Sequence, residues 1–186
     1  MSPDPDPRAG FALSAQDGTV RIVACTLETL DAEDDGGPAL ARALNSADPL
    51  SWPPEHNEAS TRDWMRSLIR DHPDRPGWGS WYILANGRPV GICGYQGPPD
   101  GSGCVEIGYS VVGGDQRQGY AGRAVTLLVA RAFSDPQVAV IAAGTLPALI
   151  ASQRVLIRQG FVLTGSSFDD EVGEILRFTL NRPQPT

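Results

Sequence analysis

The sequence predicts a mixed α/β fold, an α+β chain in which helices cover the faces of one sheet. Asn86-Gly87 separates two strand-like runs over roughly 80–96, and this dipeptide is the strongest short signal of a β-hairpin. From residue 119 onward, apolar residues recur at the spacing of an amphipathic helix. The continuous apolar run at 137–145 is typical of a strand that is buried on both faces. Together these patterns favour a mixed sheet.

The remaining elements follow from runs of β-branched residues, helical spacing and turn residues. Pro147 falls near the first turn of its helix and Gly160 just past its end, as is common at helix boundaries. The expected order is a strand at 19–27, helices at 38–45 and 58–71, strands over 80–96 and at 104–112, a helix from 119 to about 134, a strand at 137–145, a helix at 146–159, and a strand pair near 161–166 and 172–180.

The length of the chain predicts a single domain. It has 186 residues, and single-core domains commonly run about 100–200 residues. We expect this domain to cover residues 11–182. Residues 1–10 are rich in Pro and Asp and are predicted to be disordered, and residues 183–186 are predicted to be a frayed tail.

Composition and charge exclude several classes of protein. Hydrophobic residues make up 41% and charged residues 20%, as in ordinary globular proteins. No apolar run approaches the ~18 residues of a membrane span, and the first residues lack the layout of a signal peptide, so we expect a cytoplasmic protein without membrane association. The net charge of −7 opposes nucleic-acid binding and suits a cationic partner such as an amine.

The basic and thiol residues exclude further chemistry. All fifteen basic residues are Arg, so a lysine Schiff base and a phosphate loop that ends in Gly-Lys-Ser/Thr are both ruled out. Cys25, Cys93 and Cys104 are odd in number and form no Cys-x-x-Cys pair, which predicts buried thiols rather than disulfides or zinc ligands. His56 and His72 are isolated in polar contexts, so we expect them to be exposed and we predict no metal.

The strand at 104–112 has two different faces. Val105, Ile107, Tyr109 and Val111 alternate on one face, which predicts that this face packs on the core. The other face carries Glu106, Gly108 and Ser110, and its side chains are unusually small. We expect open space over that face.

The turn "DQRQGYAGRA" at 115–124 lies between this strand and the following helix. A helix N-terminus offers unpaired backbone N–H groups and the positive end of the helix dipole, which together bind anions. Gly119 and Gly122 remove side chains where a phosphate would approach, and Arg117 and Arg123 add positive charge. Two interpretations stay open on spacing alone: a diphosphate site, or a helix start whose glycines serve packing. A Gly-x-Gly-x-x-Gly dinucleotide motif does not fit, because Arg117 stands where glycine is required.

The residues of this turn resemble the acyl-CoA pyrophosphate loop of the GNAT superfamily of N-acyltransferases. The family pattern Gln/Arg-x-x-Gly-x-Gly/Ala is present here as Gln116, Arg117, Gln118, Gly119, Tyr120 and Ala121. The loop follows "VEIGYSV" and precedes "ASQRVLIRQGF" at 151–161, at the family's spacing. The three segments together are similar to the Rim-type branch, which includes acetyltransferases of ribosomal-protein N-termini.

The resemblance implies a mostly antiparallel mixed sheet that is splayed between the strands at 104–112 and 138–144, with helices on both faces. It also implies acetyl-CoA as the cosubstrate. The pantetheine arm of the cosubstrate would lie along Tyr109, Ser110 and Val111, and the pyrophosphate would lie on the amides of 117–122, up to and including Gly122.

Two positions depart from the family pattern. Family members often carry Asn at the position of Leu149, where it contacts the cosubstrate arm, and many carry a Tyr general acid at the position of Leu156. Rim-type members commonly lack that Tyr. Ser152, on the same helix, or a water molecule is the expected proton donor to the thiolate.

Acyl transfer to an amine requires that a base take a proton from the ammonium group, whose pKa is about 7.7–8.0 for an α-amine. Glu106 is the predicted base, because it lies on the open face of its strand, although a Glu on a strand can equally be a solvated surface residue. A backbone N–H near Val111 is expected to bind the thioester oxygen.

The sequence therefore predicts an N-acetyltransferase that transfers acetyl from acetyl-CoA to a primary amine, by direct attack in a ternary complex. The amine is a protein N-terminus or a small molecule, and a homodimer is one expected assembly. The alternative is a non-catalytic acyl-CoA-binding or regulatory domain of the same fold, and a third interpretation is a loop that binds nothing.

Overall fold

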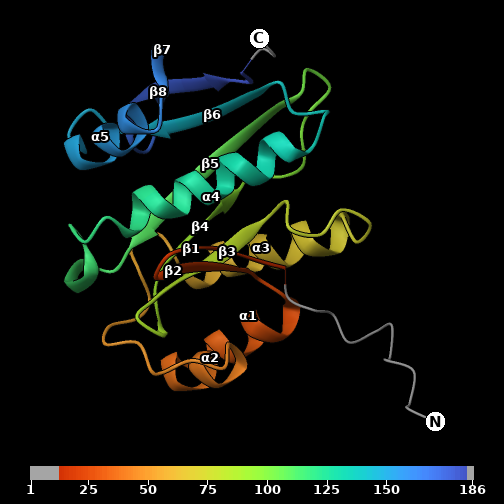
Figure 1. Cartoon of the computed structure of the whole chain (residues 1–186), viewed down its shortest axis with the longest axis vertical. Helices are drawn as coiled ribbons and strands as arrows, with labels where there is room; N and C mark the ends of the chain where they lie inside the picture. The colour runs from red at the N-terminus through yellow and green to blue at the C-terminus, as the bar shows by residue number, and fades with distance from the viewer. Residues whose placement is uncertain (1–12, 184–186) are drawn as a thin grey trace.

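The computed structural model describes residues 13–183. Within that range the chain forms one sheet of eight strands in the order β1-β2-β3-β4-β5-β6-β8-β7, and helices cover the sheet (Figure 1). The elements are β1 (Ser14–Asp17), β2 (Val20–Ala24), α1 (Leu27–Asp34), α2 (Gly37–Ala43), α3 (Ala59–Asp71), β3 (Ser80–Ala85), β4 (Arg88–Tyr95), β5 (Cys104–Val111), α4 (Tyr120–Ser134), β6 (Val140–Thr145), α5 (Ile150–Arg158), β7 (Val162–Asp169) and β8 (Gly173–Asn181).

The sheet is antiparallel except at its centre, where β5 and β6 run parallel. That parallel pairing runs from Cys104 opposite Val140 to Ile107 opposite Ala143 and then ends. Beyond it, residues 108–111 of β5 still pair with β4, but their other edge has no strand beside it within the described chain. The predicted mixed α/β fold is confirmed, and the sheet opens between the two strands that were expected to splay.

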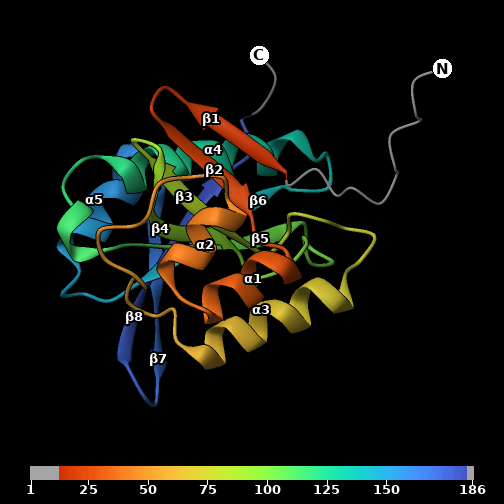
Figure 2. The ribbon, with the colours of Figure 1, turned by 90° about the horizontal axis from the view of Figure 1, so that it is seen from below.

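Each face of the sheet has its own hydrophobic core. On one face, α4 and α5 pack onto the central strands through buried residues that include Leu128 and Leu156. On the other face, α1, α2 and α3 cover the strands from β2 to β4 through Leu30, Leu40 and Met65. Figure 2 shows α3 and α4 on opposite faces of the sheet.

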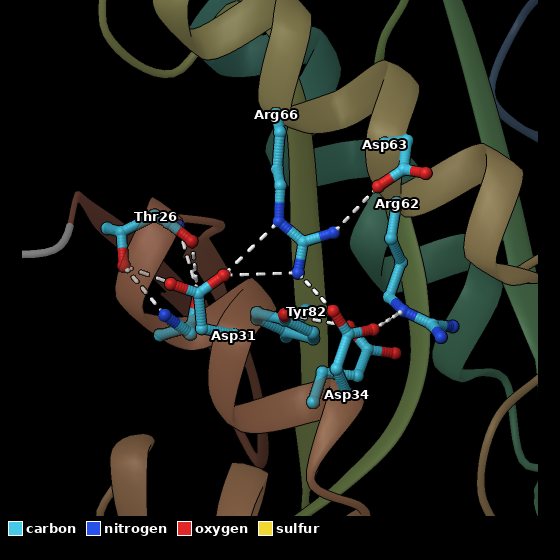
Figure 3. Close-up of polar contacts among 9 residues, drawn as sticks. Thr26, Asp31, Asp34, Arg62, Asp63, Arg66 and Tyr82 are labelled. Carbon is cyan, nitrogen blue, oxygen red and sulfur yellow. Dashed lines mark hydrogen bonds and ion pairs between the residues drawn. The ribbon is translucent and has the colours of Figure 1, made fainter.

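Ion pairs join α1 to α3 on the second face. Arg66 donates to Asp31 and Asp34 of α1 and to Asp63 of its own helix, with Nη–Oδ distances of 3.2 Å to Asp31 and 3.1 Å to Asp63. Arg62 Nε lies 2.6 Å from Asp34 Oδ1. Figure 3 shows both guanidinium groups reaching from α3 toward the carboxylates of α1. These ion pairs link the two helices at the surface, where exposed pairs add little to stability.

Most predicted elements are present with shifted ends. The hairpin turn has Asn86 at φ 51° and Gly87 at φ 74°, as the Asn-Gly signal requires. The helix expected from 146 begins at Ile150, and the strand expected from 137 begins at Val140. The predicted strand at 19–27 ends at Ala24, because Thr26 and Thr29 form a reciprocal capping box that starts α1.

Two elements were not expected from the sequence. α1 has a weak apolar periodicity, and it is held by its capping box and by packing on α2 and α3. β1 has four mostly exposed residues, and it exists as the antiparallel partner of β2. Cys25 and Cys93 are buried as predicted, whereas Cys104 is half-buried. The predicted disorder of residues 1–10 and the C-terminal tail from 184 onward lie outside the described residues.

Among residues 13–183, no helix is both long and apolar enough to cross a membrane.

Candidate active site

The candidate site lies where β5 and β6 separate. Tyr109, Ser110 and Val111 follow the last residue of β5 that pairs with β6. The carbonyl oxygen of Val111 accepts a hydrogen bond from Gln116 Nε2 at 3.1 Å, which ties the end of β5 to the turn before α4. The structure thus brings two of the predicted binding segments together.

The turn into α4 presents unpaired amides to solvent. Arg117 has φ 62° and Gly119 has φ 79°, so two residues of this turn adopt the left-handed conformation, as is common in anion-binding concavities of backbone N–H groups. Within the described chain, the amides of 117–122 donate no hydrogen bond, and no side chain caps α4. A Cβ built on Gly119 would meet no atom within 4 Å, so the space over that residue is open. The geometry fits an anion held by backbone N–H groups at a helix N-terminus.

Two side-chain contacts hold this turn against the β3–β4 hairpin. Asp115 is buried and accepts two hydrogen bonds from Arg88 of β4, both at 2.7 Å. The hydroxyl of Tyr120 accepts a hydrogen bond from Asn86 Nδ2 at 2.8 Å. The turn is therefore anchored to the β3–β4 hairpin rather than to its own helix.

The two arginines of the turn have different surroundings. Arg117 is exposed at the turn itself, in line with the expected charge beside a phosphate. Arg123 was expected to add charge as well, but its Nη1 lies 3.3 Å from Thr19 Oγ1, in the β1–β2 turn. Arg123 occupies the first turn of α4, and its side chain reaches toward the adjoining β-hairpin.

Ser152, the predicted proton donor, contacts β5 directly. Its Oγ lies 3.0 Å from the hydroxyl oxygen of Tyr109, and that hydroxyl also donates to the Ser152 carbonyl oxygen at 3.1 Å. Burial raises the pKa of Tyr109, and the hydrogen bond with Ser152 offsets part of that rise. A pair of protonated hydroxyls therefore lies between α5 and the open edge of β5.

The two leucines that depart from the family pattern have different roles in the fold. Leu156 is fully buried between α5 and the sheet, so a Tyr at this position would have to displace core side chains. Leu149 is 48% exposed and occupies the N-cap position of α5, where it makes no side-chain cap. Neither provides a polar group to the site.

Glu106, the predicted base, lies on the face of β5 opposite α4 and is half-buried. Its Oε1 accepts a hydrogen bond from Arg177 Nη1 of β8 at 3.0 Å. The nearby Gly144 of β6 leaves room for this ion pair, since a Cβ there would lie 3.2 Å from Arg177 and 3.7 Å from Glu106. Arg177 was not singled out from the sequence, because an arginine in the last strand gives no sign of its partner.

A pocket of about 230 Å³ opens on this same face, between α3 and the end of β5. Its wall combines a loop residue, the start of α3 and the facing edges of β4 and β5. The lining residues are His56, Thr61, Trp64, Met65, Ser80, Ile92–Gln96 and Gly108–Ser110. We call it the acceptor pocket, because it reaches the open end of β5 from the side opposite α4.

The loop before α3 is held by the buried carboxylate of Glu33. Its Oε1 accepts hydrogen bonds from Trp52 Nε1 at 2.9 Å and from Asn57 Nδ2 at 2.5 Å. Its Oε2 accepts one from the hydroxyl of Tyr82 at 2.9 Å. Burial raises the pKa of Glu33, and the hydrogen bonds offset part of that rise. No local pattern predicts this role, because "DAEDDGG" contains four acidic residues that the sequence does not distinguish.

The two histidines lie near opposite ends of α3. His56 is exposed, as expected, and lines the acceptor pocket. His72 is half-buried at the C-cap of α3, contrary to the expected exposure, and lines a separate apolar cavity with Trp78 and Leu68. Among the described residues, no group of three or more His, Cys, Asp or Glu side chains is arranged to hold a metal ion.

Comparison with known proteins identifies the family. The family model of the acetyltransferase (GNAT) domain matches residues 25–162, which is most of the chain. The chain belongs to the GNAT acetyltransferase family. The GNAT chain is also 31% identical over 106 residues to an uncharacterized N-acetyltransferase, YjdG, of Bacillus subtilis (strain 168), and the match covers 56% of this chain and 63% of YjdG.

Solved GNAT structures share the fold at low sequence identity. The RimL ribosomal L7/L12 α-N-protein acetyltransferase in complex with coenzyme A is 17% identical with a TM-score of 0.67, over 89% of this chain and 95% of RimL. A ribosomal-protein-S5-alanine acetyltransferase from Vibrio fischeri is 16% identical with a TM-score of 0.67, over 91% and 96% of the two chains. Mycobacterium smegmatis RimJ is 19% identical with a TM-score of 0.64, over 87% and 81%. The predicted family is confirmed, and Rim-type enzymes are among the proteins that share its fold.

Proposed function

We propose that this GNAT chain is an N-acetyltransferase that transfers the acetyl group of acetyl-CoA to a primary amine in a ternary complex. The observation that carries the proposal is the pairing of an open sheet edge at residues 108–111 with unpaired amides at 117–122. Acetyl-CoA carries an extended thioester arm and a diphosphate. The arm would bind along the open strand edge, and the diphosphate would bind to the neighbouring amides.

The residues present fit the pyrophosphate of acetyl-CoA. The amides from Arg117 to Gly122 form the anion cradle, with Gln116, Gln118, Tyr120 and Ala121 completing the turn. Gly119 is the position where a side chain would fill the cradle. Tyr109, Ser110 and Val111 provide the free backbone edge for the pantetheine arm. A backbone N–H near Val111 would stabilise negative charge on the thioester oxygen.

We propose that Glu106 and Ser152 move the protons of the transfer step. The amine nitrogen loses protons as its bond to the acetyl carbon forms, and the sulfur of CoA gains one as the C–S bond breaks. Arg177 orients the Glu106 carboxylate, which accepts a proton through water. Ser152, hydrogen-bonded to Tyr109, donates a proton toward the sulfur and is reprotonated from solvent.

The acceptor amine reaches the site through the acceptor pocket. The solved relatives RimL and the Vibrio fischeri enzyme are named for acetylating ribosomal proteins. This supports a protein N-terminus as the acceptor here, and a small-molecule amine is the alternative that the assay below compares. The expected cytoplasmic location stays a prediction.

Calorimetric titration with acetyl-CoA tests the binding half of this proposal. Wild type is expected to bind in the micromolar range, and Gly119→Trp is expected to abolish binding, because its side chain would fill the cradle. Gly173→Trp is the matched control, since Gly173 also has a positive φ (83°) and open space around it but lies at the start of β8, outside the cradle. Wild type that binds no acetyl-CoA would contradict the proposal.

Thiol release tests the catalytic half in the same samples. Acetyl-CoA is mixed with Ser- and Ala-initiated pentapeptides or with small primary amines, and free CoA is measured. Release that depends on one class of amine would establish the transferase and its acceptor class. Binding without release from any of these amines would favour the non-catalytic acyl-CoA-binding alternative.

We also propose that the predicted homodimer forms at β7. This strand lies at the edge of the sheet, and its residues are exposed on both faces except Ser167. Val162 and Leu163 are 62% and 54% exposed. Unpaired edge strands with apolar side chains favour association with another strand. Sedimentation equilibrium of wild type and of the double variant Val162→Lys/Leu163→Lys measures the assembly, and a monomeric wild type would contradict it.

A further inference from the structure

His56 has a backbone conformation that needs an explanation. Within the described chain, four residues other than glycine have a positive φ: Asn45, His56, Asn86 and Arg117. Asparagine adopts this conformation readily, and Asn86 does so in a hairpin turn. Of the other two, Arg117 lies in the proposed pyrophosphate cradle. His56, at φ 63°, is the second, and strained residues of this kind cluster at functional sites.

The neighbours of His56 show why this conformation persists. Pro54 is buried, and Asn57 is 1% exposed with its side chain bound to Glu33. The backbone carbonyl of Asn57 also accepts a hydrogen bond from Arg62 Nη1 at 2.7 Å. The loop is thus fixed on both sides of His56, and His56 itself lines the acceptor pocket. A strained residue that is held between fixed neighbours in a pocket wall points to a role for its imidazole in this pocket.

The side chains of the pocket wall include few groups that could exchange a proton at neutral pH. None of the residues that line the acceptor pocket is an Asp, Glu, Lys or Arg. Burial raises the pKa values of the other titratable groups of the wall, Cys93 and Tyr95 of β4 and Tyr109 of β5, so these groups stay protonated at neutral pH. The side chains that α3 contributes to the wall do not titrate, and Glu55 and Glu58, which flank His56 in the chain, are exposed outside it.

The acceptor enters this pocket as an ammonium ion at neutral pH, because the pKa of an α-amino group is about 7.7–8.0. Its nitrogen must become neutral before it can attack the thioester carbonyl. Imidazole is the side chain that ordinarily exchanges protons between pH 5 and 8. Glu106 does not line the pocket, and it is bound to Arg177.

We propose that His56 accepts the proton that converts the bound ammonium group to the attacking amine. This inference rests on the proposed transferase function and adds a step to it. His56 takes one proton from nitrogen and later releases it to solvent. The second proton leaves nitrogen toward Glu106 as the C–N bond forms, while the C–S bond breaks and sulfur leaves as the thiol with a proton from Ser152. One proton is released in total, as the reaction of an ammonium ion with a thioester requires.

The test uses His56→Asn, because Asn tolerates a positive φ and cannot act as a base at these pH values. His72→Asn is the matched control, since His72 lines the other cavity. Thiol release from acetyl-CoA is measured with Ser- and Ala-initiated pentapeptides between pH 6 and pH 9.5. The melting temperature and the Kd for acetyl-CoA of each variant establish that the fold and the cosubstrate site are intact.

The expected result is a pH-dependent loss. At pH 7, kcat/KM of His56→Asn falls about 100-fold, which is a typical contribution of a general base. At pH 9.5 the loss shrinks to about threefold, because most of the α-amine is already neutral above its pKa. His72→Asn keeps the wild-type profile. A merely structural role of His56 would not be rescued by raising the pH.

Other outcomes overturn the proposal. His56→Asn with wild-type kcat/KM at pH 7, or with an equal loss at pH 7 and pH 9.5, removes His56 from the reaction. If Glu106→Gln shows the recovery at high pH and His56→Asn does not, Glu106 is the residue that deprotonates the ammonium. Wild type that releases no thiol with the peptides or with small primary amines overturns the transferase function itself, which is a different failure from an active wild type beside an unchanged variant.

Discussion

The two sides of the candidate site depend on different parts of the chain, one on backbone groups and the other on side chains. The cosubstrate side, from β5 to the start of α4, offers backbone groups: an unpaired strand edge and a turn of free amides. The acceptor side, from α1 to α3, depends on side chains, with Glu33 binding Trp52, Asn57 and Tyr82. Backbone sites need small residues in a local order, whereas side-chain sites need partners that lie far apart in the sequence.

This difference predicts which substitutions matter on each side. On the acceptor side, removing one polar side chain leaves buried groups without partners. On the cosubstrate side, side-chain removal has a small effect unless it disturbs the anchor of the turn.

The largest effect is expected at Glu33. Glu33→Ala leaves the donors of Trp52, Asn57 and Tyr82 without an acceptor and should lower the free energy of unfolding by about 3–9 kcal/mol, at ~1–3 kcal/mol for each donor. Glu33→Gln keeps an oxygen at this position and should retain most of the stability. Urea denaturation measures both variants, and equal losses would show that the contacts of the carboxylate do not hold the loop.

Arg88 provides the corresponding test on the cosubstrate side. Arg88→Ala leaves the buried Asp115 carboxylate unpaired and should cost about 3 kcal/mol of unfolding free energy. Because Asp115 precedes the cradle, acetyl-CoA affinity should fall as well. Asp115→Asn/Arg88→Met, which removes both charges, should recover stability. A single variant as stable as wild type would show that the anchor is not needed.

A pH titration sharpens the comparison, because Glu33 is ionisable and the backbone cradle is not. The pKa of Glu33 is raised in the folded state by burial, so its stabilising contribution is complete below the unfolded pKa and is lost as pH rises through the folded pKa. Wild type should therefore lose stability relative to Glu33→Gln as the pH rises from about 4.5, the ordinary pKa of a glutamate, through the raised pKa of the folded state. Urea midpoints across this range measure the difference, and a constant difference would contradict the raised pKa.

The smallest effect is expected from the exposed Arg117. If the amides of the turn carry the pyrophosphate, Arg117→Ala should weaken acetyl-CoA binding only about two- to fivefold, as for an exposed ion pair. High salt should reduce even that difference, because it screens exposed charges. Calorimetry in low and high salt checks both points. A loss of a hundredfold or more would mean that side-chain charge, not backbone, forms this side of the site.

The same contrast explains what the sequence could predict. The hairpin at Asn86-Gly87, the two-faced strand at 104–112 and the glycines of the loop are local signals, and each one appears in the structure at nearly its predicted position. The contacts of Glu106 with Arg177 and of Ser152 with Tyr109 join distant segments, so no local pattern could reveal them. α1 was missed because its stability comes from packing and a capping box rather than from a strong apolar stripe.

His56 was read from the sequence as an exposed polar residue, and exposure is indeed what the structure shows. Its position in the acceptor pocket depends on a turn that is fixed by Glu33, 23 residues earlier in the chain. Both Glu33 and the loop of His56 can be read in the sequence, but only the folded structure shows that they are in contact.

The early end of the β5–β6 pairing has a further consequence for the sheet itself. Free strand edges normally occur at the margins of a sheet, where they risk aggregation with other chains. Here, besides the marginal edges at β1 and β7, a further free edge at residues 108–111 lies in the interior of the sheet, with β6 and α5 close beside it. A folded neighbour is too bulky to add a strand in that gap, whereas a thin, extended molecule can enter. Steric exclusion thus leaves the backbone groups of residues 108–111 free for a ligand while it prevents strand pairing with other proteins.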